Sequence, residues 1–196
     1  MNHISELAQL GTSTWLDDLS RERLVSGNLK EIISAKSIVG VTTNPAIFAA
    51  AMTNGTAYDA ELSTLKETKA TADEAVYALA IEDVKNACDL FADIYSSTNG
   101  ADGRVSIEVD PRISDDANAT LEQARELWSK VDRPNVMIKI PATTGSLPAI
   151  EDALAEGISV NVTLIFSVDR YRDVIEAFRT GLKRAAEAGK LSLIHI

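Results

Sequence analysis

Short apolar runs alternate along the chain with stretches that have the apolar spacing of amphipathic helices. Five runs have the length of strands, and each is followed by a stretch predicted to be helical. The predicted strands cover residues 11–16, 37–43, 104–109, 136–140 and 158–166. Because strands that alternate with helices form parallel sheets, this pattern predicts an α/β fold.

The predicted helices have recognisable starts and stops. Thr71 and Glu74 form an expected capping box at the start of a long helix. Ser114 and Ser167 are expected to cap the helices that follow the third and fifth strands. Gly157 is expected to end the helix before the fifth strand.

The faces of the strands differ in polarity. Successive side chains of a strand point to opposite faces, so in the third strand Val105 and Ile107 lie opposite Ser106 and Glu108. Polar side chains of this kind recur near the C-terminal ends of the strands, at Asp17, Asn44, Glu108, Lys139 and Asn161. Catalytic groups converge at these ends in a (β/α) barrel. A doubly wound sheet also has alternating strands and helices. Helices cover both of its faces, however, so such polar groups would not be expected to be buried together in it. The pattern therefore favours the barrel.

Lys139 is a lone amine inside an apolar strand. Burying an ammonium is costly, so a lysine in such a place tends to lose its proton. The neutral amine can attack a carbonyl group and form an iminium, which serves as an electron sink for C–C bond cleavage. Glu108 and Asp17 provide carboxylates for the proton transfers. Neutral groups suited to a polyhydroxylated substrate are provided by Asn44, Asn161 and Thr163.

Taken alone, each of these residues has a structural explanation. Lys139 could lie at a sheet edge or extend its amine to water. Glu108 could be an edge-strand charge or part of a phosphate-free salt bridge. Asp17 could be a helix N-cap, and Asn44 and Asn161 could be turn and ladder residues. The catalytic interpretation is favoured because all five fall on the C-terminal parts of successive strands.

Length and charge restrict the possible partners. The 196 residues suit a single domain over 1–196, and the formal net charge of −10 argues against nucleic acids and anionic membranes. No apolar run approaches the roughly 20 residues of a membrane span. The single cysteine, Cys88, is expected in the core and fits the reducing cytoplasm. One cysteine and two terminal histidines, His3 and His195, make no metal-ligand cluster, so no metal is expected.

Six segments together resemble the transaldolase family, specifically its longer actinobacterial-type enzymes. In chain order, up to about Gly189, they are TSTWLDDLSRERL, VGVTTNPAIF, ALAIEDVKNACDLF, VSIEVDPRIS, NVMIKIPAT and SVNVTLIFSVDRY. The resemblance implies a TIM-type (β/α)₈ barrel, here an α/β chain with about five of the eight β/α units. It also implies a cofactor-free class I enzyme of the pentose phosphate pathway. Such an enzyme moves a dihydroxyacetone unit from sedoheptulose 7-phosphate to glyceraldehyde 3-phosphate, so sugar phosphates are the implied partners.

The resemblance also implies a role for each site residue. Lys139 matches the Schiff-base lysine, and Glu108 matches the glutamate that works with the catalytic water. Asp17 matches the acid/base at the substrate hydroxyl whose deprotonation drives C–C cleavage. Thr163 matches the water-positioning threonine. The implied substrate-binding residues are Asn44 and Asn161, with Thr42 as a weaker addition.

The chain departs from the family pattern after Gly189. Residues 190–196 are expected to be an atypical tail, and the serine and arginine that hold the substrate phosphate in the family are expected to be missing. The 196-residue chain is therefore expected to have little or no transaldolase activity. Two alternatives stay open: another class I aldolase or lyase that uses the same lysine, and a non-catalytic barrel fragment.

Overall fold

The computed structural model describes residues 3–53, 56–190 and 194–195. Backbone contacts divide the chain into two compact units. The first unit comprises Met1–Val105 with Arg133–Asn135, and the second comprises Ser106–Asp132 with Val136–Ile196. The boundary falls within one strand, β3 (Arg104–Glu108), which begins in the first unit and ends in the second.

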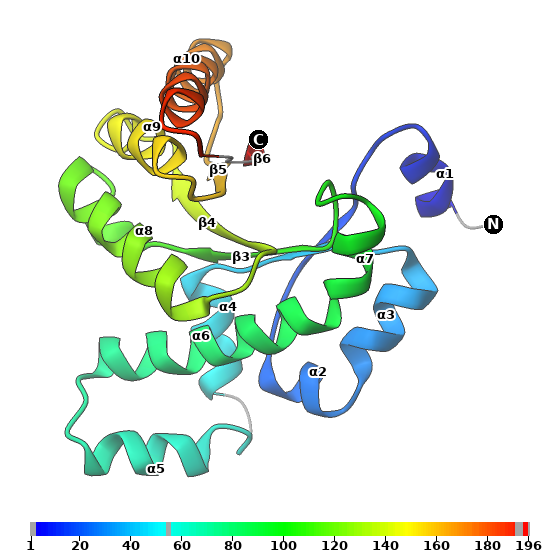
Figure 1. The fold of residues 1–196 in the computed structure, drawn as a ribbon. Coiled ribbons are helices and arrows are strands. Elements are labelled where there is room, and N and C mark those ends of the chain that lie inside the picture. The colour runs from blue at the N-terminus through cyan, green and yellow to red at the C-terminus, as the bar shows by residue number, and fades with distance from the viewer. Residues whose placement is uncertain (1–2, 54–55, 191–193, 196) are drawn as a thin grey trace. The chain divides into compact units, whose positions relative to one another are not determined.

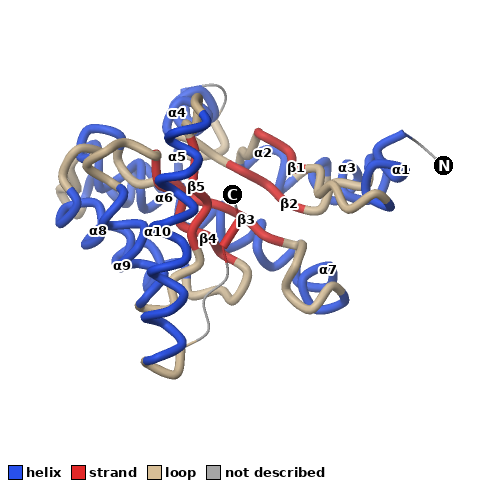
Figure 2. The backbone as a smooth tube through the Cα atoms, turned by 90° about the horizontal axis from the view of Figure 1, so that it is seen from above, coloured by secondary structure: helices blue, strands red, loops and turns tan. Residues whose placement is uncertain are grey.

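The strands of the first unit are parallel and follow one another in chain order. β1 (Trp15–Asp17) pairs with β2 (Gly40–Thr42), which pairs in turn with the start of β3. Figure 2 shows β1 and β2 side by side. Both strands are shorter than the runs at 11–16 and 37–43 that predict them, and β1 starts four residues later than expected.

The helices of the first unit gather around α6. Their bounds are α1 (His3–Gln9), α2 (Arg21–Val25), α3 (Asn28–Lys36), α4 (Pro45–Thr53), α5 (Asp59–Glu67), α6 (Ala72–Leu90) and α7 (Ala92–Ser97). Helices α2, α4, α5 and α7 all contact α6. Cys88 lies in the buried face of α6, as its sequence position predicts.

The predicted capping box at the start of α6 is confirmed. The Thr71 hydroxyl accepts a hydrogen bond from the Glu74 backbone N–H at 3.3 Å. In return, the Glu74 carboxylate accepts one from the Thr71 backbone N–H at 2.8 Å. These two bonds satisfy backbone donors that have no carbonyl partner in the first turn of a helix.

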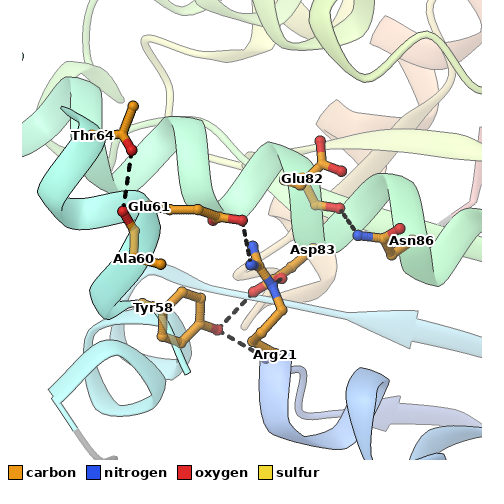
Figure 3. A network of polar contacts seen from close by, with 8 residues as sticks. All are labelled: Arg21, Tyr58, Ala60, Glu61, Thr64, Glu82, Asp83 and Asn86. Atoms are coloured by element: carbon orange, nitrogen blue, oxygen red, sulfur yellow. Dashed lines mark hydrogen bonds and ion pairs between the residues drawn. The ribbon is translucent and has the colours of Figure 1, made fainter. Parts of the chain in front are cut away.

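A buried polar network joins α2, α5 and α6 in the first unit (Figure 3). Arg21 forms an ion pair through Nε with Asp83, which is fully buried on α6, and a second through Nη1 with Glu61 at 2.7 Å. The Tyr58 hydroxyl donates to Asp83 at 2.6 Å and accepts from the Arg21 backbone N–H at 2.9 Å. The buried Asp83 carboxylate thus has a cation and a hydroxyl donor as partners and is not left unpaired.

The charge state of Arg21 follows from this network. Burial would lower the pKa of the Arg21 guanidinium, but its hydrogen bonds with Glu61 and Asp83 raise that pKa above its ordinary value. Burial and the hydrogen bond to Asp83 raise the pKa of the Tyr58 hydroxyl. Arg21 is therefore a cation and Tyr58 a neutral donor at neutral pH.

The strands of the second unit also follow one another in chain order. They are the end of β3, β4 (Val136–Pro141), β5 (Val160–Thr163) and the two-residue β6 (Ile194–His195). β4 lies between β3 and β5, and the pairing with β5 places Lys139 beside Asn161 and Pro141 beside Thr163. β5 ends earlier than the predicted run 158–166, because Leu164 has a left-handed backbone conformation, φ 61°, that a strand cannot continue.

The helices of the second unit pack in a row. The 3₁₀-helix η1 (Pro111–Ile113) is followed by α8 (Ala117–Val131), α9 (Leu147–Ala155) and α10 (Val168–Glu187). Figure 1 shows α9 and α10 side by side, and α9 also contacts α8 and β5. The apolar side chains of these contacts are buried, among them Leu127, Ile150, Leu154 and Val174.

One of the two predicted serine caps is wrong. Ser167 caps α10 as predicted, since its hydroxyl accepts from the Arg170 N–H at 3.1 Å. The N-cap of α8, however, is Asp116, whose carboxylate accepts from the Ala119 N–H at 3.0 Å. Ser114 instead closes η1, a short helix that the sequence pattern does not predict and that moves the start of α8 along the chain.

The fold is α/β, and its strands have the order expected for a TIM-type barrel. Within the described residues, β1 to β5 are parallel neighbours in chain order, and each is followed by at least one helix. This confirms the predicted five β/α units. A single domain over 1–196 stays a prediction, and of the predicted atypical tail 190–196, residues 191–193 and 196 lie outside the described residues.

Candidate active site

Lys139 lies in an interior strand of the second unit. Its strand, β4, has β3 on one side and β5 on the other, and the Val109 N–H donates to the Lys139 carbonyl at 3.1 Å. The residue is 9% exposed. The two structural explanations for Lys139, a sheet-edge position and an amine extended to water, are therefore wrong.

Glu108 is the charged neighbour of the Lys139 amine. Its Oε2 lies 3.2 Å from Nζ of Lys139, and it is as deeply buried as the lysine. The explanation of Glu108 as an edge-strand charge is wrong, because β3 has a strand on each side. Its explanation as part of a salt bridge agrees with the contact to Lys139. In this buried ion pair, the Glu108 carboxylate can take a proton from the Lys139 amine or return one to it.

Asn161 stands next to Lys139 on the neighbouring strand. The two residues are register partners, so their side chains emerge on the same face of the sheet. The Asn161 Nδ2 donates a hydrogen bond to Oγ of Ser106 at 3.2 Å. Thr163 follows two residues later on this face, where β5 ends.

The second unit thus brings four of the predicted residues together on two adjacent strands and the end of β3. The structure adds Ser106, to which the sequence analysis assigned no role. The sequence does indicate that Ser106 lies on the same face as Glu108, because residues two apart in a strand share a face.

Asp17 and Thr42 form the corresponding pair in the first unit. They are register partners at the C-terminal ends of β1 and β2. Asp17 is exposed and lines an open cleft of about 620 Å³. It is not a helix cap, because the N-cap of α2 is Ser20, whose hydroxyl accepts from the Arg23 N–H at 3.3 Å. This excludes the structural alternative for Asp17 and leaves its carboxylate at a strand end.

Asn44 has a local role that the sequence alternative foresaw. Its Oδ1 accepts a hydrogen bond from the Ile47 N–H at 3.0 Å, in the first turn of α4. The same side chain still has its Nδ2 group to offer a ligand. The turn role and the substrate role of Asn44 are therefore compatible.

Two further properties of the described residues concern metals and membranes. They contain no group of three or more His, Cys, Asp and Glu side chains that could hold a metal ion. No helix in this part of the chain combines the length and the apolarity of a membrane span.

Comparison with known proteins gives this arrangement a family. The family described as Transaldolase/Fructose-6-phosphate aldolase matches residues 14–193. The chain belongs to this family. The match covers every strand that carries a predicted site residue, and membership of the transaldolase family accounts for the barrel class.

Curated relatives are similar over almost the whole chain. Proteins named "Transaldolase" from Mycolicibacterium smegmatis and Kocuria rhizophila are each 56% identical to it, over 194 and 191 residues. One from Mycobacterium leprae is 55% identical over 188 residues. These alignments cover 96–98% of this chain but only 50–52% of each relative. The chain therefore spans about half the length of the curated transaldolases it matches.

Proposed function

We propose that this chain carries the catalytic lysine of a transaldolase. The reaction transfers a dihydroxyacetone unit from sedoheptulose 7-phosphate to glyceraldehyde 3-phosphate, through a Schiff base on Lys139. The observation that carries the proposal is the buried Lys139 with the Glu108 carboxylate 3.2 Å from its amine. Its support is the 54–56% identity to proteins named transaldolase.

The first half of the reaction forms and uses the iminium. The neutral Lys139 amine attacks the ketose carbonyl carbon, and loss of one water gives the iminium. Asp17 takes the proton of the hydroxyl beside the bond to be broken. The C–C bond then cleaves, its electron pair moves into the iminium to form an enamine, and the aldose product leaves.

The second half reverses these steps on the acceptor. The enamine carbon attacks the carbonyl carbon of glyceraldehyde 3-phosphate, and the new alkoxide takes a proton from Asp17. Water then adds to the regenerated iminium and releases Lys139. Glu108 handles the protons of this water, and Thr163 holds it.

The remaining residues bind the substrate. Asn44, Asn161 and Thr42 offer neutral hydrogen-bonding groups to the sugar hydroxyls. No metal or organic cofactor takes part, because the lysine iminium is itself the electron sink. We infer that the protein acts on sugar phosphates in the cytoplasm, where its buried Cys88 stays reduced.

Aldolase activity is a second candidate for the same lysine. The description of the matching family names fructose-6-phosphate aldolase beside transaldolase. In an aldolase the enamine is protonated to the iminium, and water hydrolyses this iminium to free dihydroxyacetone and the lysine amine. A transaldolase instead passes the enamine to an aldehyde. Product analysis with and without glyceraldehyde 3-phosphate separates the two.

Trapping with borohydride tests the proposal. Reduction of the iminium formed with fructose 6-phosphate converts it into a stable secondary amine, and we expect the mass adduct on Lys139. The Lys139→Arg variant is the control and should take up no adduct. Labelling of the Mycolicibacterium smegmatis relative under conditions that leave this chain unlabelled would favour a non-catalytic fragment.

A further inference from the structure

Ser106 is a buried polar residue close to the Lys139–Glu108 ion pair. The proposed mechanism gives Ser106 no role. It is fully buried in β3, two residues before Glu108 and on the same face. The opposite face of β3 is apolar, with Val105, Ile107 and Val109 at most 1% exposed. Because a buried hydroxyl is costly unless it forms hydrogen bonds, a serine at this position calls for a physical reason.

The hydrogen bond between Asn161 and Ser106 crosses an entire strand. β4 lies between β3 and β5, and neighbouring strands are about 4.8 Å apart, so β3 and β5 are separated by about 10 Å. The two side chains nevertheless meet at 3.2 Å. They therefore reach toward each other over β4, on the face from which Lys139 emerges.

Ser106 and Glu108, which are neighbours on this face of β3, contact different partners. Glu108 contacts the Lys139 amine, and Ser106 contacts the Asn161 amide. Lys139 and Asn161 are themselves register partners. The four side chains are thus linked by one ion pair, one hydrogen bond and one strand pairing within the second unit.

We propose that Ser106 is a positioning residue that orients the Asn161 amide for a hydroxyl group of the ketose bound to Lys139. This inference rests on the proposed Schiff-base function. Ser106 engages one Nδ2 hydrogen, so the amide keeps its second N–H donor and its Oδ1 acceptor. A sugar hydroxyl can donate to Oδ1 and accept from that N–H. Without Ser106 the amide can turn about its last torsion, whose energy wells are broad, and the two groups lose their fixed direction.

A pair of ketones tests this role. Dihydroxyacetone carries a hydroxyl on each side of its carbonyl, and acetone carries none. Both form an iminium with the Lys139 amine by loss of water, and borohydride delivers hydride to the iminium carbon to give a secondary amine. The measured quantity is the ratio of labelling rates of Lys139, dihydroxyacetone over acetone.

We expect Ser106→Ala to lower this ratio about fivefold, the effect of one typical hydrogen bond, through the dihydroxyacetone rate alone. A loss of folding would instead lower both rates together. Ser159→Ala, a buried serine near the start of β5, is the matched control and should leave the ratio unchanged. In an Asn161→Ala background, Ser106→Ala should have no additional effect, because Ser106 acts through Asn161.

The possible results separate the two proposals. An unchanged ratio in Ser106→Ala, with Lys139 still labelled, overturns the role of Ser106 and leaves the Schiff-base function intact. An additional fall in the double variant also overturns it, since Ser106 would then act independently of Asn161. Absence of labelling by either ketone in the unmodified protein overturns the Schiff-base function and the Ser106 proposal with it.

Discussion

At the scale of single residues, the chain contains several positions where one side chain decides whether a buried group is satisfied. Asp83 is such a position, because its carboxylate pairs with Arg21 and accepts from Tyr58 while fully buried. Arg21 is itself mostly buried, with a side chain 12% exposed. Removing one partner of a buried pair leaves the other charge without compensation.

We expect Asp83→Ala to lower the free energy of unfolding by up to about 3–5 kcal/mol, because the Arg21 cation loses its buried partner and keeps the half-exposed Glu61. Urea unfolding of the 196-residue protein measures this loss. Glu82→Ala is the matched control, since Glu82 is the exposed neighbour on the same helix and should change stability by less than about 0.5 kcal/mol. Equal losses in the two variants would contradict the role of the network.

Gly103 allows a second test at this scale. Its φ is +77°, and an added Cβ would lie 2.2 Å from the Tyr95 backbone nitrogen. Gly11 has a similar φ of +88° with no atom within 4 Å of an added Cβ. Both alanine variants should lose about 1 kcal/mol or more to the left-handed backbone, and Gly103→Ala should lose a further ~1–3 kcal/mol to the clash. Thermal or urea unfolding compares them, and a loss no greater at Gly103 than at Gly11 would show that the backbone moves aside.

At the scale of elements, the capping residues in the sequence predict where a helix begins, unless another turn lies just before the helix. The capping box of α6 and the serine cap of α10 are both predicted by the sequence and confirmed. The cap of α8 is not, because Asp110 and Pro111 start a 3₁₀ turn before it. The end of β5 was misplaced for a comparable reason, since the conformation of Leu164 has no sequence signature of the kind a glycine gives.

The capping box provides a prediction at this scale. Thr71→Ala should destabilise the protein by about 1 kcal/mol, because the Glu74 N–H loses its acceptor at the start of α6. Thr64→Ala on α5 is the control, since its hydroxyl bonds only to the Ala60 carbonyl within the helix (Figure 3) and alanine favours helix. Guanidinium unfolding distinguishes a loss at Thr71 from no loss at Thr64. A neutral Thr71→Ala would mean that Glu74 alone holds this turn.

At the scale of the whole molecule, the number of β/α units governs what can be expected of the isolated chain. The described residues provide five such units, whereas a TIM-type barrel has eight, and the curated relatives are about twice as long. Lys139, the proposed Schiff-base lysine, and its carboxylate neighbour Glu108 nevertheless lie together within the second unit. Formation of the Schiff base and complete turnover are therefore separable properties.

We expect the 196-residue chain to turn over sedoheptulose 7-phosphate much more slowly than the Mycolicibacterium smegmatis relative, or not at all. The physical reason is that phosphate binding in a TIM-type barrel commonly uses the loops after its last strands. Aldose release in a coupled assay, at equal protein concentrations, measures this. Turnover equal to that of the relative would overturn the expectation.

The sequence by itself determined the alternation of strands and helices and the apolar faces of the strands, and it placed Lys139 within an apolar strand. These features depend on the spacing of residues a few positions apart, which the backbone geometry of a strand or helix converts directly into a face. The sequence motifs also gave the family, which the comparisons then confirmed.

Only the tertiary structure decided which residues of different strands meet. The 3.2 Å contact between Lys139 and Glu108 and the hydrogen bond from Asn161 to Ser106 depend on strand order and register. The same holds for the burial of Asp83 with Arg21 and Tyr58, which are 62 and 25 residues away along the chain. Pairings at such separations depend on how the elements pack, so no local pattern specifies them.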